Sequence, residues 1–324
     1  MPAPFSVDRL IFICWDGVRY SEMDRLLSIG SLPTLSSIIS QGSISTLYIT
    51  DHLTWTDPGH SQMLGGYSIQ VDGTGDGAFA TKGEGLGVFK HFKSRGITTA
   101  VINSRESERT RKDDVVFKHI GHGYFKWNFR NEMKNIDYYW GAQEYGKENN
   151  IYSVDPLFGF LVLPGQLTGE VTNNKAKKWI LNNINKRFFM FMHFGEPDSR
   201  GHGFTGGSIE YTNAIIECDR VTGDLVNFLK TNNIYNSKTL VVITTDHGFN
   251  TNNRDHSNPP YPLGPVDTYK TFFAANLPIV SYPVIGDQAD TAPTLIELMG
   301  IDSTTIIPKY DISKPLWLRS STFP

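Results

Sequence analysis

Three aspartates and three histidines lie at or just beyond the ends of short apolar runs: Asp16, Asp198, His202, Asp246, His247 and His256. Asp198 and His202 are spaced i and i+4. Asp246 and His247 are adjacent, and His256 follows nine residues after His247. Carboxylates and neutral imidazoles are the ligands that Zn²⁺ and similar divalent ions take when thiolates are absent. This donor set is large enough to fill two metal sites.

A cation cluster is the economical explanation for gathering three aspartates at one edge of a fold, because like-charge repulsion would otherwise raise their carboxyl pKa values. A single aspartate after a strand is often only a helix N-cap, and a lone histidine is usually a surface or core residue. Six such residues after three apolar runs favour the metal interpretation. The two cysteines, Cys14 and Cys218, are too few for a disulfide framework or a cysteine zinc module, and we interpret both as small core residues.

Thr56 is the candidate nucleophile. It follows a strand-like segment at 44–49 and stands two residues before Pro58, which suits the first turn of a helix. We therefore expect Thr56 at a helix N-terminus, where backbone N–H groups and the helix dipole favour an anion. Its hydroxyl, bound to a divalent ion, would ionise near neutral pH and become a nucleophile. The structural alternative is that Thr56 serves only as an N-cap.

The elements that must position these side chains alternate along the chain. Continuous apolar runs, typical of strands buried on both faces, span residues 10–15, 98–102, 188–194 and 240–245. Helical spacing of apolar residues spans 32–41, 86–95, 170–186 and 208–229. The alternation predicts an α/β fold with a mostly parallel central sheet and helices on both faces. Ligands bind beyond the carboxyl ends of the strands in such sheets, which is where the candidate residues stand.

Residues 104–169 break this alternation. A charged opening at 105–114 is followed by an aromatic-rich segment at 124–140. We interpret 104–169 as a small inserted cap or lid on a catalytic α/β domain made of residues 1–103 and 170–324. Its aromatic side chains would either pack as a satellite core or add specificity to a neighbouring site.

Composition limits the remaining classes of function. The 324 residues are 39% hydrophobic and 19% charged, values ordinary for a folded domain. A net charge of -3 provides no positive electrostatic field that would attract a polyanion, so we expect no nucleic-acid partner. The first apolar run is too short for a signal peptide, and no uncharged run approaches the roughly 20 residues that span a bilayer. We therefore expect a cytoplasmic protein with no membrane segment.

Four motifs resemble, in their order, those of the alkaline phosphatase superfamily: Asp16-Gly17-Val18-Arg19, Thr56-Asp57-Pro58-Gly59-His60, Glu196-Pro197-Asp198-Ser199-Arg200-Gly201-His202 and Thr245-Asp246-His247-Gly248. The branch they resemble most is the type I phosphodiesterase and nucleotide pyrophosphatase group. The helix expected at 210–229, with Asp219 and Gly223, and the late segment 290–298 are also similar to that superfamily. The likeness spans nearly the whole chain apart from the insertion.

The resemblance implies two ligand sets, one of Asp16, Thr56, Asp246 and His247 and the other of Asp198, His202 and His256. It implies that Thr56 is the catalytic nucleophile and that phosphoric ester hydrolysis passes through a covalent phosphothreonine. Zinc is the usual metal pair in that branch, and manganese serves in the related phosphomutases, so Mn²⁺ is the alternative cofactor. The implied substrate is a small-molecule phosphodiester or nucleotide pyrophosphate.

The chain departs from the diesterase pattern at two points. In that branch the last histidine ligand lies far downstream of the Asp-His pair, whereas no histidine follows His256 here. The run 255–260 instead resembles the corresponding segment of cofactor-independent phosphoglycerate mutases and phosphopentomutases. The asparagine that helps the diesterases hold a phosphoryl oxygen has no match, and the region after Tyr67 offers Asp72 and Asp76 in its place.

Two alternative functions follow. A phosphomonoesterase or phosphomutase would use the same bimetal centre, and would need cations such as those of the charged opening at 105–114 to face the extra phosphate charge. A diesterase would instead need an apolar platform, which the aromatics at 124–140 could supply.

A non-catalytic metal-binding protein is disfavoured because no expected ligand and no nucleophile is missing. A sulfatase is disfavoured because its nucleophile is Cys or Ser followed by Pro and Arg.

Substrate contacts are the least determined part of the site. Arg19, Arg200 and Lys126 are candidates by position, although surface solvation is the default interpretation of each. His60 is expected to orient the loop of the nucleophile rather than to bind metal.

Overall fold

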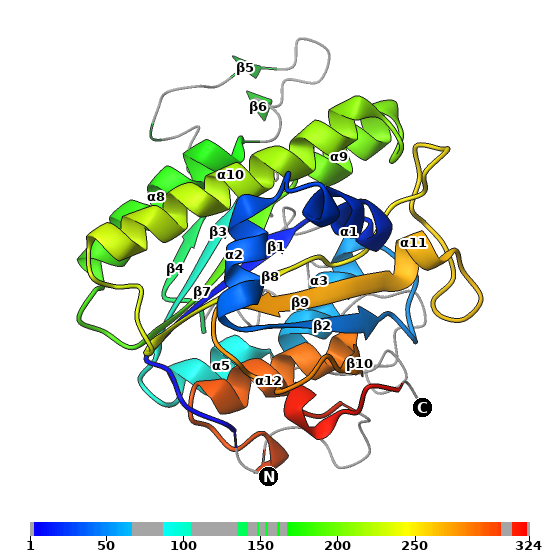
Figure 1. Ribbon diagram of the computed structural model, residues 1–324. Coiled ribbons are helices and arrows are strands. Elements are labelled where there is room, and N and C mark those ends of the chain that lie inside the picture. The colour runs from blue at the N-terminus through cyan, green and yellow to red at the C-terminus, as the bar shows by residue number, and fades with distance from the viewer. Residues whose placement is uncertain are drawn as a thin grey trace.

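The computed structural model describes residues 3–66, 87–104, 135–141, 148, 153–154, 161–162, 167–305 and 313–322. Within these residues, one eight-stranded sheet has the order β10-β2-β9-β8-β1-β7-β3-β4 (Figure 1). Its strands, in chain order, are β1 (Arg9–Trp15), β2 (Ser43–Tyr48), β3 (Thr98–Asn103), β4 (Tyr138–Trp140), β7 (Phe188–Phe194), β8 (Thr239–Thr244), β9 (Lys270–Ala275) and β10 (Ile285–Asp287). A separate two-stranded ladder joins β5 (Ser153–Val154) to β6 (Leu161–Val162).

Most neighbouring strands of the large sheet are parallel. Only β9, paired with β2 and β8, runs antiparallel to its neighbours among the strands described. The central strands β1, β7 and β8 are buried almost throughout, as expected for apolar strands covered on both faces. The predicted fold class, a mostly parallel sheet with helices on both faces, is confirmed.

Helices cover both faces of the sheet (Figure 1). One face carries α1 (Tyr20–Ser28), α2 (Pro33–Gln41), α8 (Gly169–Asn182) and α10 (Ile209–Thr231), whose apolar side chains share one core cluster with Ile11, Ile13 and Trp15. The other face carries α3 (Thr56–Gly65), α5 (Val88–Lys93) and α12 (Thr291–Leu298), in a second cluster with Leu10, Phe12 and Cys14. Alternate residues of β1 therefore enter opposite cores.

The shorter helical elements connect these layers. They are α9 (Glu196–Phe204), which follows β7, α11 (Val266–Tyr269), and the 3₁₀ turns η1 (Gln288–Asp290), η2 (Ser303–Thr305) and η3 (Leu316–Leu318). The sequence pattern did not indicate α1, α9, β4 or the antiparallel β9. α1, α9 and β4 are short or lie in polar stretches, so local periodicity does not report them. β9 is a largely apolar strand, and its antiparallel direction depends on its partners β2 and β8.

Two residues of the superfamily-like helix α10 have structural roles where α10 meets α2. The Asp219 carboxylate accepts hydrogen bonds from the N–H groups of Thr34 and Leu35, at 3.0 and 2.8 Å, and so caps the first turn of α2. Burial raises the pKa of Asp219. A Cβ at Gly223 would stand 2.5 Å from Thr34 Oγ1, so the helices approach closely because position 223 has no side chain.

Part of the 104–169 segment belongs to the main sheet. β4 pairs in parallel with β3, Trp140 is buried, and the Tyr138 ring packs 6.2 Å from that of Trp179. These aromatics pack as core. Much of the expected cap, including 105–134 with the charged opening and Lys126, lies outside the described residues. The boundaries 104 and 169 of the insertion stay a prediction.

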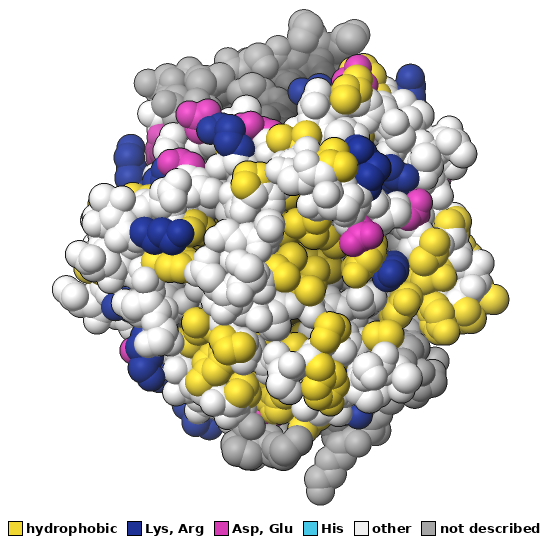
Figure 2. Space-filling view, viewed as in Figure 1, with side chains coloured by type: hydrophobic (Ala, Val, Ile, Leu, Met, Phe, Trp, Pro, Cys, Tyr) yellow, Lys and Arg dark blue, Asp and Glu magenta, His cyan; other side chains and the backbone are white. Residues whose placement is uncertain are grey.

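No helix in the described part of the chain combines the length and apolar character needed to cross a bilayer. On the face drawn in Figure 2, Lys and Arg side chains stand in small separate groups rather than in one continuous stripe.

Candidate metal centre

Three neighbouring strands deliver the three aspartates to one edge of the sheet. Asp16 follows β1, Asp246 lies two residues after β8, and Asp198 lies in the first turn of α9, just after β7. Because β8, β1 and β7 are adjacent and parallel, their carboxyl ends meet. All three carboxylates are buried, and the Asp198 N–H donates to the Asp16 carbonyl at 3.1 Å.

A first cluster of donor atoms surrounds His247 Nε2. Asp16 Oδ1 lies 3.3 Å from this nitrogen, Asp246 Oδ2 lies 3.6 Å from it, and Thr56 Oγ1 lies 3.1 Å from it. Ligands about 2.0–2.2 Å from a tetrahedral ion stand roughly 3.3–3.6 Å from one another. The donor atoms of Asp16, Asp246 and His247 therefore have the mutual spacing of ligands around one cation.

A second cluster joins Asp198, His202 and His256. Asp198 Oδ1 lies 3.3 Å from His202 Nε2 and 3.2 Å from His256 Nε2. The two imidazole nitrogens are 3.1 Å apart. His247 also comes within 4.8 Å of Asp198 and His256, and its ring stacks on that of His256 at 3.9 Å, so the clusters adjoin. The structure thus brings together all seven residues that the sequence nominated.

Backbone carbonyls set the direction of the three imidazoles. The Nδ1–H groups of His247, His256 and His202 donate to the carbonyls of Gly248, Thr54 and Arg254, at 2.7, 2.6 and 2.8 Å. A neutral imidazole with its proton on Nδ1 presents a lone pair at Nε2, which is the form that binds metal. The Nε2 lone pairs and the carboxylate oxygens of each cluster point at one another and repel. A cation between them would remove this repulsion, so the two clusters fit two divalent ions.

Asp246 is oriented by main-chain groups. Its Oδ1 accepts from the N–H groups of Gly17 and His247 at 3.1 and 3.0 Å, and Oδ2 faces the first cluster. Gln288 holds the Asp246 carbonyl through its side-chain amide at 2.5 Å. This ligand is therefore fixed before any cation binds.

Thr56 begins α3, so the predicted position at a helix N-terminus is confirmed. Its side chain is buried and points at His247. A Cβ at Gly59 would lie 2.6 Å from the Asp246 carbonyl oxygen, so the first turn of α3 packs directly on the end of β8. Glycine at this position lets Thr56 reach the first cluster.

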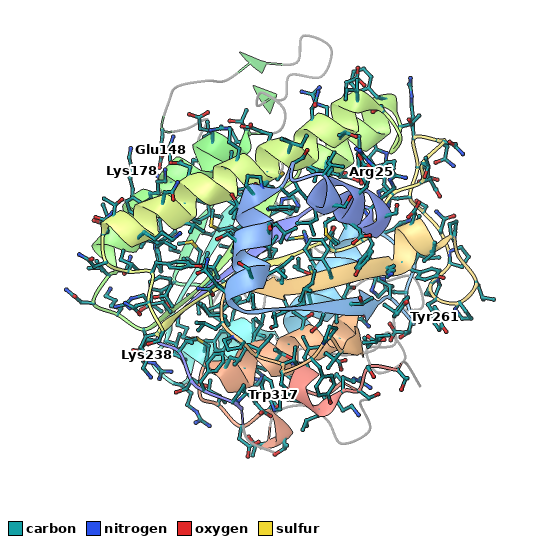
Figure 3. All side chains as sticks on the ribbon, in the orientation of Figure 1. Arg25, Glu148, Lys178, Lys238, Tyr261 and Trp317 are labelled. Atoms are coloured by element: carbon teal, nitrogen blue, oxygen red, sulfur yellow. The ribbon has the colours of Figure 1, made fainter. Side chains whose placement is uncertain are left out.

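The segments that carry Thr56 and His256 are bound side by side. The Thr54 N–H donates to the Asn258 carbonyl at 3.1 Å, and the Thr54 hydroxyl donates to the His256 carbonyl. Tyr261, labelled in Figure 3, donates its N–H to Ile49 at 2.8 Å and packs its ring 5.0 Å from that of Tyr48. These contacts join the two clusters across some 200 residues of sequence.

Other nominated residues have different surroundings. Arg19 is buried, and its guanidinium binds Thr251 and Asp267 at 2.5 and 3.4 Å, so neither a phosphate contact nor surface solvation describes it. Arg200 is exposed on α9. His60 is buried with its Nε2 3.6 Å from Asp246 Oδ2, behind the first cluster. Asp72 and Asp76 lie outside the described residues.

Cys14, His60 and Asp246 form a third group of potential donors within 4.8 Å of one another. Burial raises the pKa of the Cys14 thiol well above its usual value, and the negative charges of Asp246 and Asp16 add to the effect. Cys14 therefore stays a protonated thiol, which supports its interpretation as a core residue.

His193 is the residue of this site that sequence reasoning missed. It lies in β7, buried, with its Nε2 3.0 Å from Asp16 Oδ2. The signal was present in the sequence, because His193 is the single polar residue of the run 188–194.

We expect Gly17→Ala to disturb both clusters at once. Gly17 has φ +70°, and a Cβ there would stand 3.1 Å from Asp198 Cβ and 3.3 Å from His247 Cε1. Backbone strain and these contacts should lower the free energy of unfolding by about 1–3 kcal/mol and weaken metal binding. Urea denaturation and zinc titration measure the two effects.

Gly30→Ala is the matched control, because Gly30 has φ +74° but no atom within 4 Å of its would-be Cβ. It should lose a similar amount of stability and bind zinc normally. Equal zinc affinities in the two variants would contradict the steric explanation.

Comparison with known proteins places this fold in a class. A protein of the alkaline phosphatase superfamily from Vibrio parahaemolyticus has a TM-score of 0.63 at 15% identity, covering 98% of this chain and 72% of that one. Alkaline phosphatase from the Antarctic bacterium TAB5 has a TM-score of 0.61 at 13% identity, covering 93% of this chain and all of that one. The fold is that of the alkaline phosphatase superfamily.

Within that superfamily the branch is also defined. The sequence profile described as "Type I phosphodiesterase / nucleotide pyrophosphatase" matches residues 10–264. The chain belongs to this family. "Ectonucleotide pyrophosphatase/phosphodiesterase family member 7" of Mus musculus is 37% identical over 67 residues, a segment that spans 21% of this chain and 15% of that relative.

Proposed function

We propose that this protein hydrolyses phosphodiester or nucleotide pyrophosphate bonds of small molecules at a two-metal site, with Thr56 as the nucleophile. The observation that carries the proposal is the position of Thr56 Oγ1, at a helix N-terminus and 3.1 Å from His247 Nε2, beside a second cluster of metal-type donors. Family membership supports the diester class over the monoester class.

The chain would hold one divalent ion with Asp16, Asp246, His247 and Thr56, and another with Asp198, His202 and His256. Histidine with carboxylate oxygen favours Zn²⁺, and Mn²⁺ is the alternative. Such ions, when bound, lower the pKa of a coordinated hydroxyl or water and neutralise charge on phosphoryl oxygens.

Thr56 and the first turn of α3 have separate roles in the proposed reaction. Thr56 Oγ1 would attack phosphorus in line with the leaving oxygen, so that the Thr56–phosphorus bond forms as the bond to the leaving alcohol or phosphate breaks. The resulting covalent phosphothreonine linkage still carries the second ester group of the substrate. The N-terminal N–H groups of α3 adjoin Thr56, and their partial positive charge would favour the anionic phosphoryl oxygens. Water would then cleave the Thr56–phosphorus bond, which releases the retained group as a phosphate monoester and regenerates the Thr56 hydroxyl.

The first test combines metal content with a substrate panel. We expect two equivalents of zinc per chain, and a kcat/KM for an aryl phosphodiester at least about tenfold above that for the matching aryl monoester, a difference of about 1.4 kcal/mol in transition-state binding. An aryl sulfate is the third substrate, and chelated protein reloaded with zinc or manganese is the control.

Three other outcomes of this test would contradict the proposal. Preference for the monoester would identify a phosphatase or mutase with the same centre. Two bound metals with no turnover of any ester would identify a non-catalytic metal-binding protein. Failure to bind metal would overturn the site assignment altogether.

A further inference from the structure

His193 is a polar side chain near the carboxyl end of an otherwise apolar strand. The other six residues of β7 are Phe or Met, and every residue of the strand is buried. β7 lies between β1 and β3, so His193 belongs to an interior strand of the sheet. Burying an imidazole there is unfavourable unless its polar atoms find a partner.

Strand alternation brings His193 to Asp16. Phe189 and Phe191 of β7 enter the core on the α3 side, so His193, two residues on, projects to the same face. In β1 the same face takes Phe12 and Cys14, and Asp16 continues that series. The parallel register aligns Cys14 with His193, so the carboxylate of Asp16 comes within reach of the imidazole.

The contact has a defined direction. His193 Nε2 lies 3.0 Å from Asp16 Oδ2, and an ionised carboxylate only accepts hydrogen bonds, so Nε2 carries the proton and donates it. Within the described part of the chain, His193 Nδ1 has no hydrogen-bond partner. The partner that justifies this buried imidazole is therefore Asp16.

Packing holds the imidazole in place. The His60 ring meets the His193 ring edge to face at 5.0 Å, with 87° between the planes. His60 in turn packs edge to face on Phe191 at 5.4 Å. The donor is thus fixed on one side by its strand and on another by α3.

The two carboxylates of the first cluster differ in what orients them. Two main-chain N–H groups hold Asp246 Oδ1, and no substitution of a side chain removes them. Asp16 Oδ2 is held by the side chain of His193, which leaves Oδ1 facing His247 Nε2 at 3.3 Å. The contact that holds Asp16 Oδ2 therefore comes from a side chain, which a substitution can remove.

We infer that His193 is a positioning residue, which holds Asp16 so that its Oδ1 alone is offered to the cation of the first cluster. This inference rests on the proposed two-metal function. Hydrogen bonds to the outer oxygen of a metal-binding carboxylate typically change metal affinity by about 10–100-fold. The effect should be confined to the first cluster, because the contact lies on Asp16 and not on Asp198, His202 or His256.

The test uses two amides that differ by one methylene. In His193→Gln the side-chain N–H₂ group can occupy the place of Nε2, whereas in His193→Asn it reaches only as far as Nδ1. Zinc is titrated against a chromogenic chelator to give the affinity of each of the two equivalents. We expect one equivalent of the Asn variant to weaken by about 10–100-fold, the other to stay unchanged, and the Gln variant to resemble the wild type.

Thermal unfolding of the metal-free proteins checks that both variants fold. Three results would overturn the inference: unchanged affinities in the Asn variant, equal weakening in the Gln and Asn variants, or equal weakening of both equivalents in the Asn variant. If the wild type binds two zinc ions but cleaves no ester, the proposed function fails while the affinity comparison still decides the role of His193.

Discussion

Thr56→Ala is expected to lower turnover by about 10⁴-fold or more, the scale of loss seen when a covalent nucleophile is removed. Alanine deletes the hydroxyl that lies 3.1 Å from His247 Nε2 and leaves Asp16, Asp246 and His247 in place. Three donors suffice to hold a catalytic zinc, so both metal equivalents should remain bound. Steady-state kinetics and metal analysis of the same preparation measure the two quantities.

Thr56→Ser is the control for this experiment, because it keeps the hydroxyl and removes only a methyl group. It should retain most of the activity and should form a phosphorylated serine that mass spectrometry of the quenched reaction detects. Activity of the alanine variant near the wild-type level would rule out Thr56 as the nucleophile. Loss of metal from that variant would mean that Thr56 acts mainly as a ligand.

Asp198→Asn should remove one of the two metal equivalents and reduce turnover by about 10³-fold, in the range that mutation of an electrostatic group in an active site produces. Asp198 Oδ1 is the one carboxylate oxygen that stands within 3.3 Å of both His202 and His256 among the described contacts. The neutral amide is a weaker ligand for a divalent cation than a carboxylate. Zinc stoichiometry after gel filtration is the measurement.

Asp219→Asn separates loss of metal from the general effect of altering a buried aspartate. Asp219 is as buried as Asp198 but caps α2 through Thr34 and Leu35. Its substitution should lower stability and leave two zinc equivalents bound. A fall to one equivalent in both variants would show that the stoichiometry reports stability rather than ligation.

The strands at the centre of the sheet could be predicted from the sequence, but the direction of their neighbour β9 could not. The apolar runs at 10–15, 188–194 and 240–245 correspond to β1, β7 and β8, since strands covered on both faces need continuous apolar residues. The antiparallel β9 was missed because its direction is set by β2 and β8, which flank it in space. Whether a strand runs parallel or antiparallel depends on the strands that pair with it, and the local sequence pattern does not identify those partners.

Arg19 shows a different limit. Its place after Asp16-Gly17-Val18 made it a candidate phosphate contact, yet its guanidinium is buried against Thr251 and Asp267. Both partners lie more than 200 residues away in the chain. The role of a long, flexible side chain depends on what packs beside it.

The sequence by itself determined which potential metal donors follow the buried strands and in what order they occur, because acids and imidazoles placed there stand out from the apolar pattern. It also determined that Thr56 begins a helix, through Pro58. Only the tertiary structure decided which atoms face one another. The adjacency of β8, β1 and β7 gathers the carboxylates, carbonyls such as that of Thr54 turn the imidazoles, and His193 turns Asp16. These contacts join residues far apart in the chain, and hydrogen-bond direction arises only when both partners are in place.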